Sequence, residues 1–129
     1  MPSSPVPSIR ALVVDEAAPT RQRLGRMLSE LDGVIAQTCG GRAADVLRRY
    51  PDWRPHCVVF DLPAHDPQGF ELLGLLRKLN PGCLVVVLTD GESDEVRRHS
   101  RHLGADHVLD KSTEFERVVD LVCALGAPS

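Results

Sequence analysis

Short apolar runs alternate along the chain with segments in which hydrophobic residues recur at helical spacing. The apolar runs cover residues 11–14, 34–36, 57–60, 84–88 and 108–109. The first, third and fourth runs are rich in valine and have no polar interruption, which is typical of parallel strands covered on both faces. The pattern therefore predicts five strands, with the valine-rich ones in the middle of a sheet.

The segments between the runs predict five helices. The first segment has one hydrophobic stripe, formed by Leu24, Met27, Leu28 and Leu31. Gly104, after the fourth segment, suits the end of a helix. The predicted helices cover residues 19–31, 43–50, 70–79, 92–103 and 112–125. Five strand–helix units predict an α/β fold of the (βα)5 type, a doubly wound open parallel sheet with helices on both faces. A closed eight-unit barrel would need about twice this length.

The chain of 129 residues has the length of one domain with its own hydrophobic core. We expect this domain to cover residues 9–126. Residues 1–8 are predicted to form a disordered lead, because three prolines among serines prevent regular pairing there. Residues 127–129 are predicted to form a short C-terminal tail.

Charge and composition exclude several classes of partner. A net charge of −3 provides no positive field for direct binding to nucleic acid or to an anionic membrane. No apolar run approaches the ~20 residues needed to span a bilayer, and the N-terminus lacks the pattern of a secretory signal. The four cysteines are widely scattered, with no C-x-x-C pair that would indicate a zinc site. These features predict a reduced, cytoplasmic protein.

Polar side chains stand where the predicted strands end. Asp15 and Glu16 follow the first strand, Asp61 follows the third, Thr89 follows the fourth, and Lys111 lies just after the fifth. The carboxyl ends of parallel strands in an open sheet share one edge, which is where such sheets bind their ligands. We therefore expect three carboxylates, one hydroxyl and one ammonium group to converge at that edge.

This set of groups predicts phosphoryl acceptance. Two carboxylates 4 Å apart repel by ~4 kcal/mol at an effective dielectric constant near 20, so either their pKa values rise or a cation binds. Hard oxygen ligands favour Mg²⁺. Lys111 and Thr89 provide an ammonium group and a hydroxyl for phosphoryl oxygens, and Asp61 provides the nucleophile. Lys78 and Lys111 are the only lysines among 15 basic residues, so a lysine at this strand end is informative.

Four stretches of the chain resemble the response regulator receiver domains, the CheY-like family: ALVVDE, CVVFDLPAHDPQGFELL, VVVLTDGES and LGADHVLDKS. The resemblance covers nearly the whole chain, from Arg10 to about Leu125. It implies a flavodoxin-like sheet with strand order 2-1-3-4-5. It also implies a two-component phosphorelay receiver, a cytoplasmic signalling phosphoprotein that consists of a single receiver domain.

The resemblance assigns roles to individual residues. Asp61 corresponds to the phosphorylated aspartate, Thr89 to the switch hydroxyl and Lys111 to the phosphoryl-contacting lysine. The residues that correspond to the Mg²⁺ ligands are Asp15, Glu16, Asp61 and the backbone carbonyl of Pro63.

The resemblance also implies partners. The donor is a phosphohistidine on a histidine kinase or a phosphotransfer protein. Phosphorylation changes a surface formed by the fourth helix, fifth strand and fifth helix, which binds a downstream protein. No enzymatic activity is expected beyond weak self-phosphatase activity. The basic residues of the fourth helix, among them Arg97, Arg98 and Arg101, belong either to this surface or to a solvated face.

Three departures from the family pattern bear on phosphorylation and switching. Asp90 follows Thr89 where the family favours a small residue, so its bulk and charge are expected to affect phosphorylation. Val108 stands in place of the usual aromatic residue of the last strand, which predicts that a rotating-ring switch is absent. Ser112 follows Lys111 where a cis proline is common. Since a cis bond before another residue costs ~3 kcal/mol, we expect a different loop path there.

Two other functions compete with the receiver. A phosphatase of the haloacid-dehalogenase type needs a second aspartate two residues after the nucleophile, and Pro63 stands there, so the general acid is missing. A phosphorylation-independent protein-interaction module with a receiver fold is kept open by Asp90 and Val108. Uptake of a phosphoryl group separates this module from a true receiver.

Overall fold

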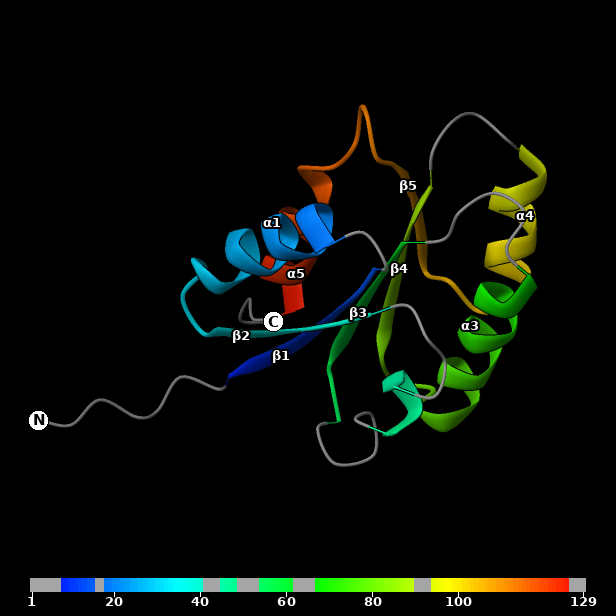
Figure 1. The fold of residues 1–129 in the computed structure, drawn as a ribbon, viewed down its shortest axis with the longest axis horizontal. Coiled ribbons are helices and arrows are strands. Elements are labelled where there is room, and N and C mark those ends of the chain that lie inside the picture. Colours follow the sequence, from blue (N-terminus) through cyan, green and yellow to red (C-terminus); the bar gives the residue numbers. More distant parts are fainter. Residues whose placement is uncertain are drawn as a thin grey trace, which may run out of the picture.

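A five-stranded parallel sheet with the strand order β2-β1-β3-β4-β5 forms the centre of the protein (Figure 1). The computed structural model describes residues 8–15, 18–40, 45–48, 54–61, 67–89 and 94–125. The strands are β1 (Ile9–Val14), β2 (Val34–Cys39), β3 (Cys57–Asp61), β4 (Leu84–Thr89) and β5 (His107–Asp110). The predicted strand order and fold class are confirmed.

Helices cover both faces of the sheet. The helices are α1 (Ala18–Ser29), α3 (Pro67–Leu79), α4 (Asp94–His102) and α5 (Arg117–Leu125). Residues 45–48 are also helical, and the rest of the helix predicted over 43–50 lies outside the described residues. Figure 1 shows α1 and α5 on one face of the sheet, with α3 and α4 side by side on the other.

Alternate strand residues point to opposite faces and build two hydrophobic cores. On one side, Val59 of β3 belongs to a buried cluster with residues of α1 and α5, namely Leu24, Leu28, Val118 and Val122. On the other side, the adjacent Val58 belongs to a cluster with residues of α3, namely Leu72, Leu73 and Leu76. Burying each such side chain stabilises the fold by about 1.5–3 kcal/mol, so the two layers fix the sheet between the helices.

Some element boundaries differ from those predicted. Strand β2 continues to Cys39 rather than ending at residue 36, because it is an edge strand paired only with β1 and tolerates the half-buried Gln37 and Thr38. Helix α5 begins at Arg117 rather than at Ser112, and a series of turns precedes it. Apart from Ser8, the predicted lead and tail lie outside the described residues. Within the described ranges, no helix is long and apolar enough to cross a membrane.

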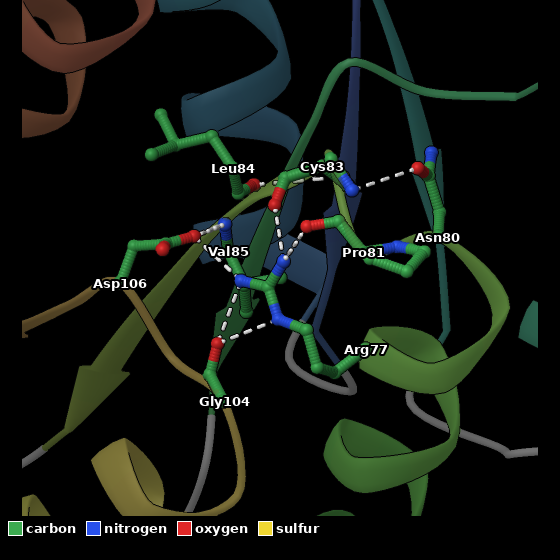
Figure 2. Close-up of polar contacts among 9 residues, drawn as sticks. Arg77, Asn80, Pro81, Cys83, Leu84, Val85, Gly104 and Asp106 are labelled. Carbon is green, nitrogen blue, oxygen red and sulfur yellow. Dashed lines mark hydrogen bonds and ion pairs between the residues drawn. The ribbon is translucent and has the colours of Figure 1, made fainter.

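The side chain of Arg77, in the last turn of α3, connects this helix to the turns that precede β4 and β5 (Figure 2). Its Nε and Nη2 atoms donate to the carbonyl oxygen of Gly104 at 2.9 and 2.6 Å. Its Nη1 atom donates to the carbonyl oxygens of Pro81 and Cys83, both at 2.8 Å. Nη2 also lies 2.6 Å from Oδ2 of Asp106. One guanidinium group therefore holds three separate segments together.

Gly104 makes this close approach possible. Its φ of +116° is one that residues with a side chain rarely adopt, and a Cβ atom at this position would lie 2.6 Å from Cγ of Arg77. The glycine also follows the end of α4, as the sequence predicts, and its N–H donates to the carbonyl oxygen of Arg101 at 3.1 Å. Gly104 therefore ends α4 and also leaves room for the Arg77 side chain to lie against its backbone.

His56 joins the turn before β3 to β1. The ring Nδ1 of His56 accepts a hydrogen bond from the backbone N–H of Arg10 at 2.9 Å. The backbone N–H of His56 donates to the Arg10 carbonyl oxygen at 2.8 Å. Partial desolvation lowers the pKa of His56 below its ordinary value of 6.5 although the residue is exposed, and the nearby Arg10 guanidinium lowers it further. The fold therefore favours the neutral imidazole, which can accept this hydrogen bond.

We expect His56 to make folding pH-dependent. Its pKa is lower in the folded than in the unfolded chain, so between the two values the unfolded chain binds more protons. The stabilisation is fully present above about pH 6.5 and is lost as the pH falls through the folded-state pKa. In urea unfolding between about pH 7.5 and 5, His56→Asn, which keeps an acceptor oxygen near the Nδ1 position, should remove this part of the pH dependence. An unchanged pH dependence in the variant would assign it to other groups.

Candidate functional site

Four of the predicted site residues stand at the carboxyl edge of the sheet. Asp15 directly follows β1, Asp61 ends β3, Thr89 ends β4, and Lys111 directly follows β5. The strands between them are in register, since Asp61 pairs with Leu88 and the N–H of Lys111 donates to the carbonyl oxygen of Thr89 at 3.0 Å. The register of the sheet therefore brings these polar residues to one edge. Glu16 and Pro63, the other two predicted ligands, lie outside the described residues, as does Asp90.

Lys111 and Asp61 form an ion pair across this edge. Nζ of Lys111 donates a hydrogen bond to Oδ2 of Asp61, although the two strands are separated by β4. The side chains are 19% and 10% exposed, so the pair is largely shielded from solvent. A lysine held in this way can neutralise negative charge that arrives at Asp61.

The pKa of Asp61 reflects its surroundings. Burial raises it, the hydrogen bond from Lys111 lowers it, and the neighbouring carboxyl of Asp15 raises it again, to about 6 in total. The hydrogen bond from Lys111 favours the ionised and nucleophilic form of Asp61. The Asp15 carboxyl is itself buried, with 2% of the residue exposed. Two carboxyl groups therefore share one shielded position.

Thr89 contributes a buried hydroxyl at the same edge. The residue is 1% exposed, and its Oγ1 has no hydrogen-bond partner among the described residues. A buried hydroxyl without a partner costs about 1–3 kcal/mol. An anionic oxygen bound at this edge would offset that cost by accepting a hydrogen bond from Thr89.

The turn after β5 holds Lys111 in place. Oδ1 of Asp110 accepts hydrogen bonds from the N–H of Ser112 at 2.8 Å and from its Oγ at 2.6 Å. These bonds from Ser112 lower the pKa of the Asp110 carboxyl. Glu114 closes the turn with two hydrogen bonds to Asp110. The backbone N–H of Glu114 donates to the Asp110 carbonyl oxygen at 2.8 Å, and Oε1 of Glu114 accepts from the Asp110 N–H at 3.2 Å.

This turn explains the sequence departure at Ser112. Among the described residues no peptide bond is cis, and the N–H of Ser112 is used in the turn. A proline has no N–H and could not make this bond. The peptide bond before Ser112 is therefore trans, and Ser112 forms part of a turn stabilised by the Asp110 side chain. The sequence carried a signal for it, because an aspartate two residues before a serine is typical of a side-chain-stabilised turn.

The same turn is connected to α4. Arg97 of α4 donates through Nη1 to the carbonyl oxygen of Val108 at 3.1 Å, and its Nη2 lies 3.7 Å from Oε1 of Glu114. Val108 is 4% exposed and belongs to the core on the α3 side of the sheet. Sequence reasoning did not identify Asp110 and Glu114 as parts of the site. They connect the turn that carries Lys111 to α4 through polar contacts.

The described donor set suits a small hard cation. Asp15 and Asp61 present carboxylate oxygens at one point, and Mg²⁺ characteristically binds one or two carboxylates together with water and phosphate oxygens. Within the described residues, no group of three or more His, Cys, Asp or Glu side chains is placed to hold a metal. The two described carboxylates are ligands of the type and number that Mg²⁺ uses, and the third predicted carboxylate, Glu16, is not among the described residues.

The sequence and fold match known proteins. The family model of the response regulator receiver domain matches residues 11–123. The chain is 32% identical over 112 residues to the probable transcriptional regulatory protein TcrX of Mycobacterium tuberculosis, covering 86% of this chain and 47% of that protein. It is 27% identical over 106 residues to protein-glutamate methylesterase/protein-glutamine glutaminase 3 of Geobacter sulfurreducens, covering 82% and 28%. The chain thus spans half or less of the length of these two relatives.

A solved structure has the same fold. The two-component response regulator of the LuxR family from Aurantimonas sp. SI85-9A1 superposes with a TM-score of 0.80 at 21% identity, covering 92% of this chain and 85% of that one. At 21% identity this similarity supports the fold alone. The assignment of the site rests on the positions of Asp15, Asp61 and Lys111 at the carboxyl edge of the sheet.

Proposed function

The chain belongs to the response regulator receiver domain family, and from this premise we propose that Asp61 accepts a phosphoryl group from a phosphohistidine donor. The observation that supports the assignment most directly is the shielded ion pair between Asp61 and Lys111. The buried hydroxyl of Thr89 at the same edge adds a hydrogen-bond donor for the phosphoryl group. These groups supply a nucleophile, a positive charge and a donor, which phosphoryl transfer requires.

Each residue then has a defined chemical part. A carboxylate oxygen of Asp61 forms the new bond to phosphorus while the bond between phosphorus and the donor imidazole breaks, and the released histidine takes up a proton. Lys111 neutralises charge on the phosphoryl oxygens, and Thr89 donates a hydrogen bond to one of them. Mg²⁺, bound by Asp15, Glu16, Asp61 and the carbonyl of Pro63, would supply the remaining positive charge.

The same proposal covers partners and output. A histidine kinase or phosphotransfer protein in the cytoplasm supplies the phosphoryl group, and a downstream protein binds the face formed by α4, β5 and α5. The contacts of Arg97 with Glu114 and with the Val108 carbonyl support this face, because they connect α4 to the turn that carries Lys111. We further propose that the chain has no enzymatic activity beyond slow loss of its own phosphoryl group.

Incubation with acetyl phosphate and Mg²⁺, followed by intact mass measurement, tests the proposal. We expect the chain to gain one phosphoryl group and Asp61→Asn to gain none, because the amide is not nucleophilic. Asp120→Asn, an exposed position on α5, serves as the matched control and should be phosphorylated like the original chain. Removal of the metal with EDTA should also prevent uptake.

The phosphorylation-independent interaction module makes the opposite prediction. If a correctly folded chain gains no phosphoryl group from acetyl phosphate or from a phosphohistidine-bearing donor domain, the acceptor role of Asp61 is wrong. Phosphorylation that persists in Asp61→Asn would place the acceptor elsewhere. Circular dichroism of each variant shows whether the fold is intact.

A further inference from the structure

A groove of about 580 Å³ runs between α3 and α4, on the face of the sheet opposite α1 and α5 (Figure 1). Phe70, Gly74 and Leu75 of α3 line it on one side, and Leu103, just after α4, lines it on the other. None of these residues belongs to the phosphoryl acceptor site. The groove therefore requires a separate explanation.

The groove passes over Gly74, which has no side chain. A Cβ atom added there would lie 3.8 Å from Cδ2 of Leu103, an ordinary contact, so a larger residue would fit sterically and begin to fill the space. A glycine inside a helix is less favourable than an alanine. Phe70, which also lines the groove, packs edge-to-face against His99 of α4 with ring centroids 4.4 Å apart.

Exposed leucines extend this apolar surface. Leu75 and Leu79 are 44% and 56% exposed, and a spacing of four residues places them one above the other on α3. Among the described residues, the other large hydrophobic side chains with comparable exposure are Ile35 and Leu125, on different elements. Exposed apolar residues that are clustered beside a hollow are typical of binding surfaces, whereas scattered ones are not.

The charges around the groove favour an acidic partner. Lys78 and His102 line it, and Arg101 is exposed in the same last turn of α4. Glu71 is the acidic residue of the lining. Basic residues in a last turn also interact favourably with the helix dipole, but this does not account for the two exposed leucines. The C-terminal ends of both helices thus combine positive charge with apolar surface.

We propose that the α3–α4 groove is a docking site for an acidic segment of a partner protein. A leucine- or phenylalanine-like side chain of that segment inserts beside Gly74, and its carboxylates lie against Lys78 and His102. The site is distinct from the face of α4, β5 and α5 assigned to output, and it does not depend on phosphorylation of Asp61. Apolar anchoring gives the affinity, and complementary charge gives the selectivity.

A titration of the full chain, labelled with ¹⁵N and followed by NMR, tests the site. The probe is a synthetic peptide in which glutamate pairs alternate with leucine pairs. We expect shifts confined to α3, α4 and Leu103, with a Kd on the order of 10–100 μM. A peptide with lysine in place of each glutamate, and one with serine in place of each leucine, should each bind roughly tenfold more weakly or worse.

Two variants test the two parts of the groove. Gly74→Met fills the hollow, and Lys78→Glu reverses the charge, so each should weaken binding of the acidic peptide roughly tenfold. Arg26→Glu makes the same charge change at an exposed position on α1, on the opposite face, and should leave binding unchanged. If Gly74→Met does not fold, Gly74→Ala provides a smaller obstruction and Lys78→Glu still tests the charge.

Several results would overturn the proposal. One is the absence of NMR shifts at up to about 1 mM of the acidic peptide. The others are equal binding of the lysine or serine peptide, and NMR shifts that map outside α3 and α4. Concentration-dependent shifts of the same residues without any peptide would mean that a second copy of the chain, rather than an acidic partner, covers the groove.

Discussion

Replacing Arg77 by methionine is expected to lower the free energy of unfolding by about 2–3 kcal/mol. The change keeps most of the aliphatic volume and removes the guanidinium group that binds the carbonyl oxygens of Gly104, Pro81 and Cys83. These oxygens lose donors that water cannot fully replace, because the Arg77 side chain is only 20% exposed. Asp106 loses its counterion but keeps the hydrogen bond from the N–H of Val85, at 2.8 Å.

Urea unfolding of the variant measures this loss. Lys78→Met is the matched control, because it makes the same kind of change at the next, exposed position and should shift stability by less than about 0.5 kcal/mol. Arg77→Lys should be intermediate, since an ammonium group cannot reach all four acceptors at once. A loss below about 1 kcal/mol for Arg77→Met would mean that the three segments do not depend on this side chain.

Replacing Lys111 by methionine is expected to slow phosphoryl uptake from acetyl phosphate by roughly 100-fold, a typical loss when one charge-stabilising donor is removed. Lys111 makes the ion pair with Asp61 and is therefore the described cation nearest to the incoming phosphoryl group. Its removal also withdraws the hydrogen bond that lowers the pKa of Asp61, so a larger fraction of that carboxyl is protonated near neutral pH. The rate is measured by intact mass at successive times.

Lys78→Met is again the matched control, because Lys78 is the only other lysine in the chain. It should be phosphorylated at the original rate. Lys111→Arg keeps the charge and should recover part of the rate, which a purely structural role in holding β5 would not predict. Uptake by Lys111→Met at the original rate would contradict the role assigned to Lys111.

The strands were predictable because local hydrophobic pattern determines them, whereas their order was predictable only from the resemblance to receiver domains. Runs such as 57–60 and 84–88 are apolar throughout, and only strands with both faces covered bury such runs completely. The convergence of Asp61 and Lys111 was predictable for the same reason, since both stand at strand ends and parallel strands share one carboxyl edge. The proposed roles of all six site residues stay predictions, and Glu16 and Pro63 also lie outside the described residues.

Contacts between distant segments were not predictable from local pattern. The start of α5 at Arg117 depends on side-chain hydrogen bonds of Asp110 and Glu114, which compete with helix formation over residues 111–116. The role of Arg77 depends on three backbone carbonyl groups outside α3. The local sequence pattern around Arg77 does not indicate these contacts. The groove beside Gly74 likewise arises only when two helices lie next to each other.

The placement of the sulfur atoms has a practical consequence. Cys57 and Cys83 belong to cores on opposite sides of the sheet, Cys39 is also buried, and burial raises the pKa of the Cys57 thiol. Cys123 is exposed on α5. The native fold therefore presents one readily alkylated thiol, so a dye attached through maleimide chemistry would carry a defined position and stoichiometry without any engineering of the chain.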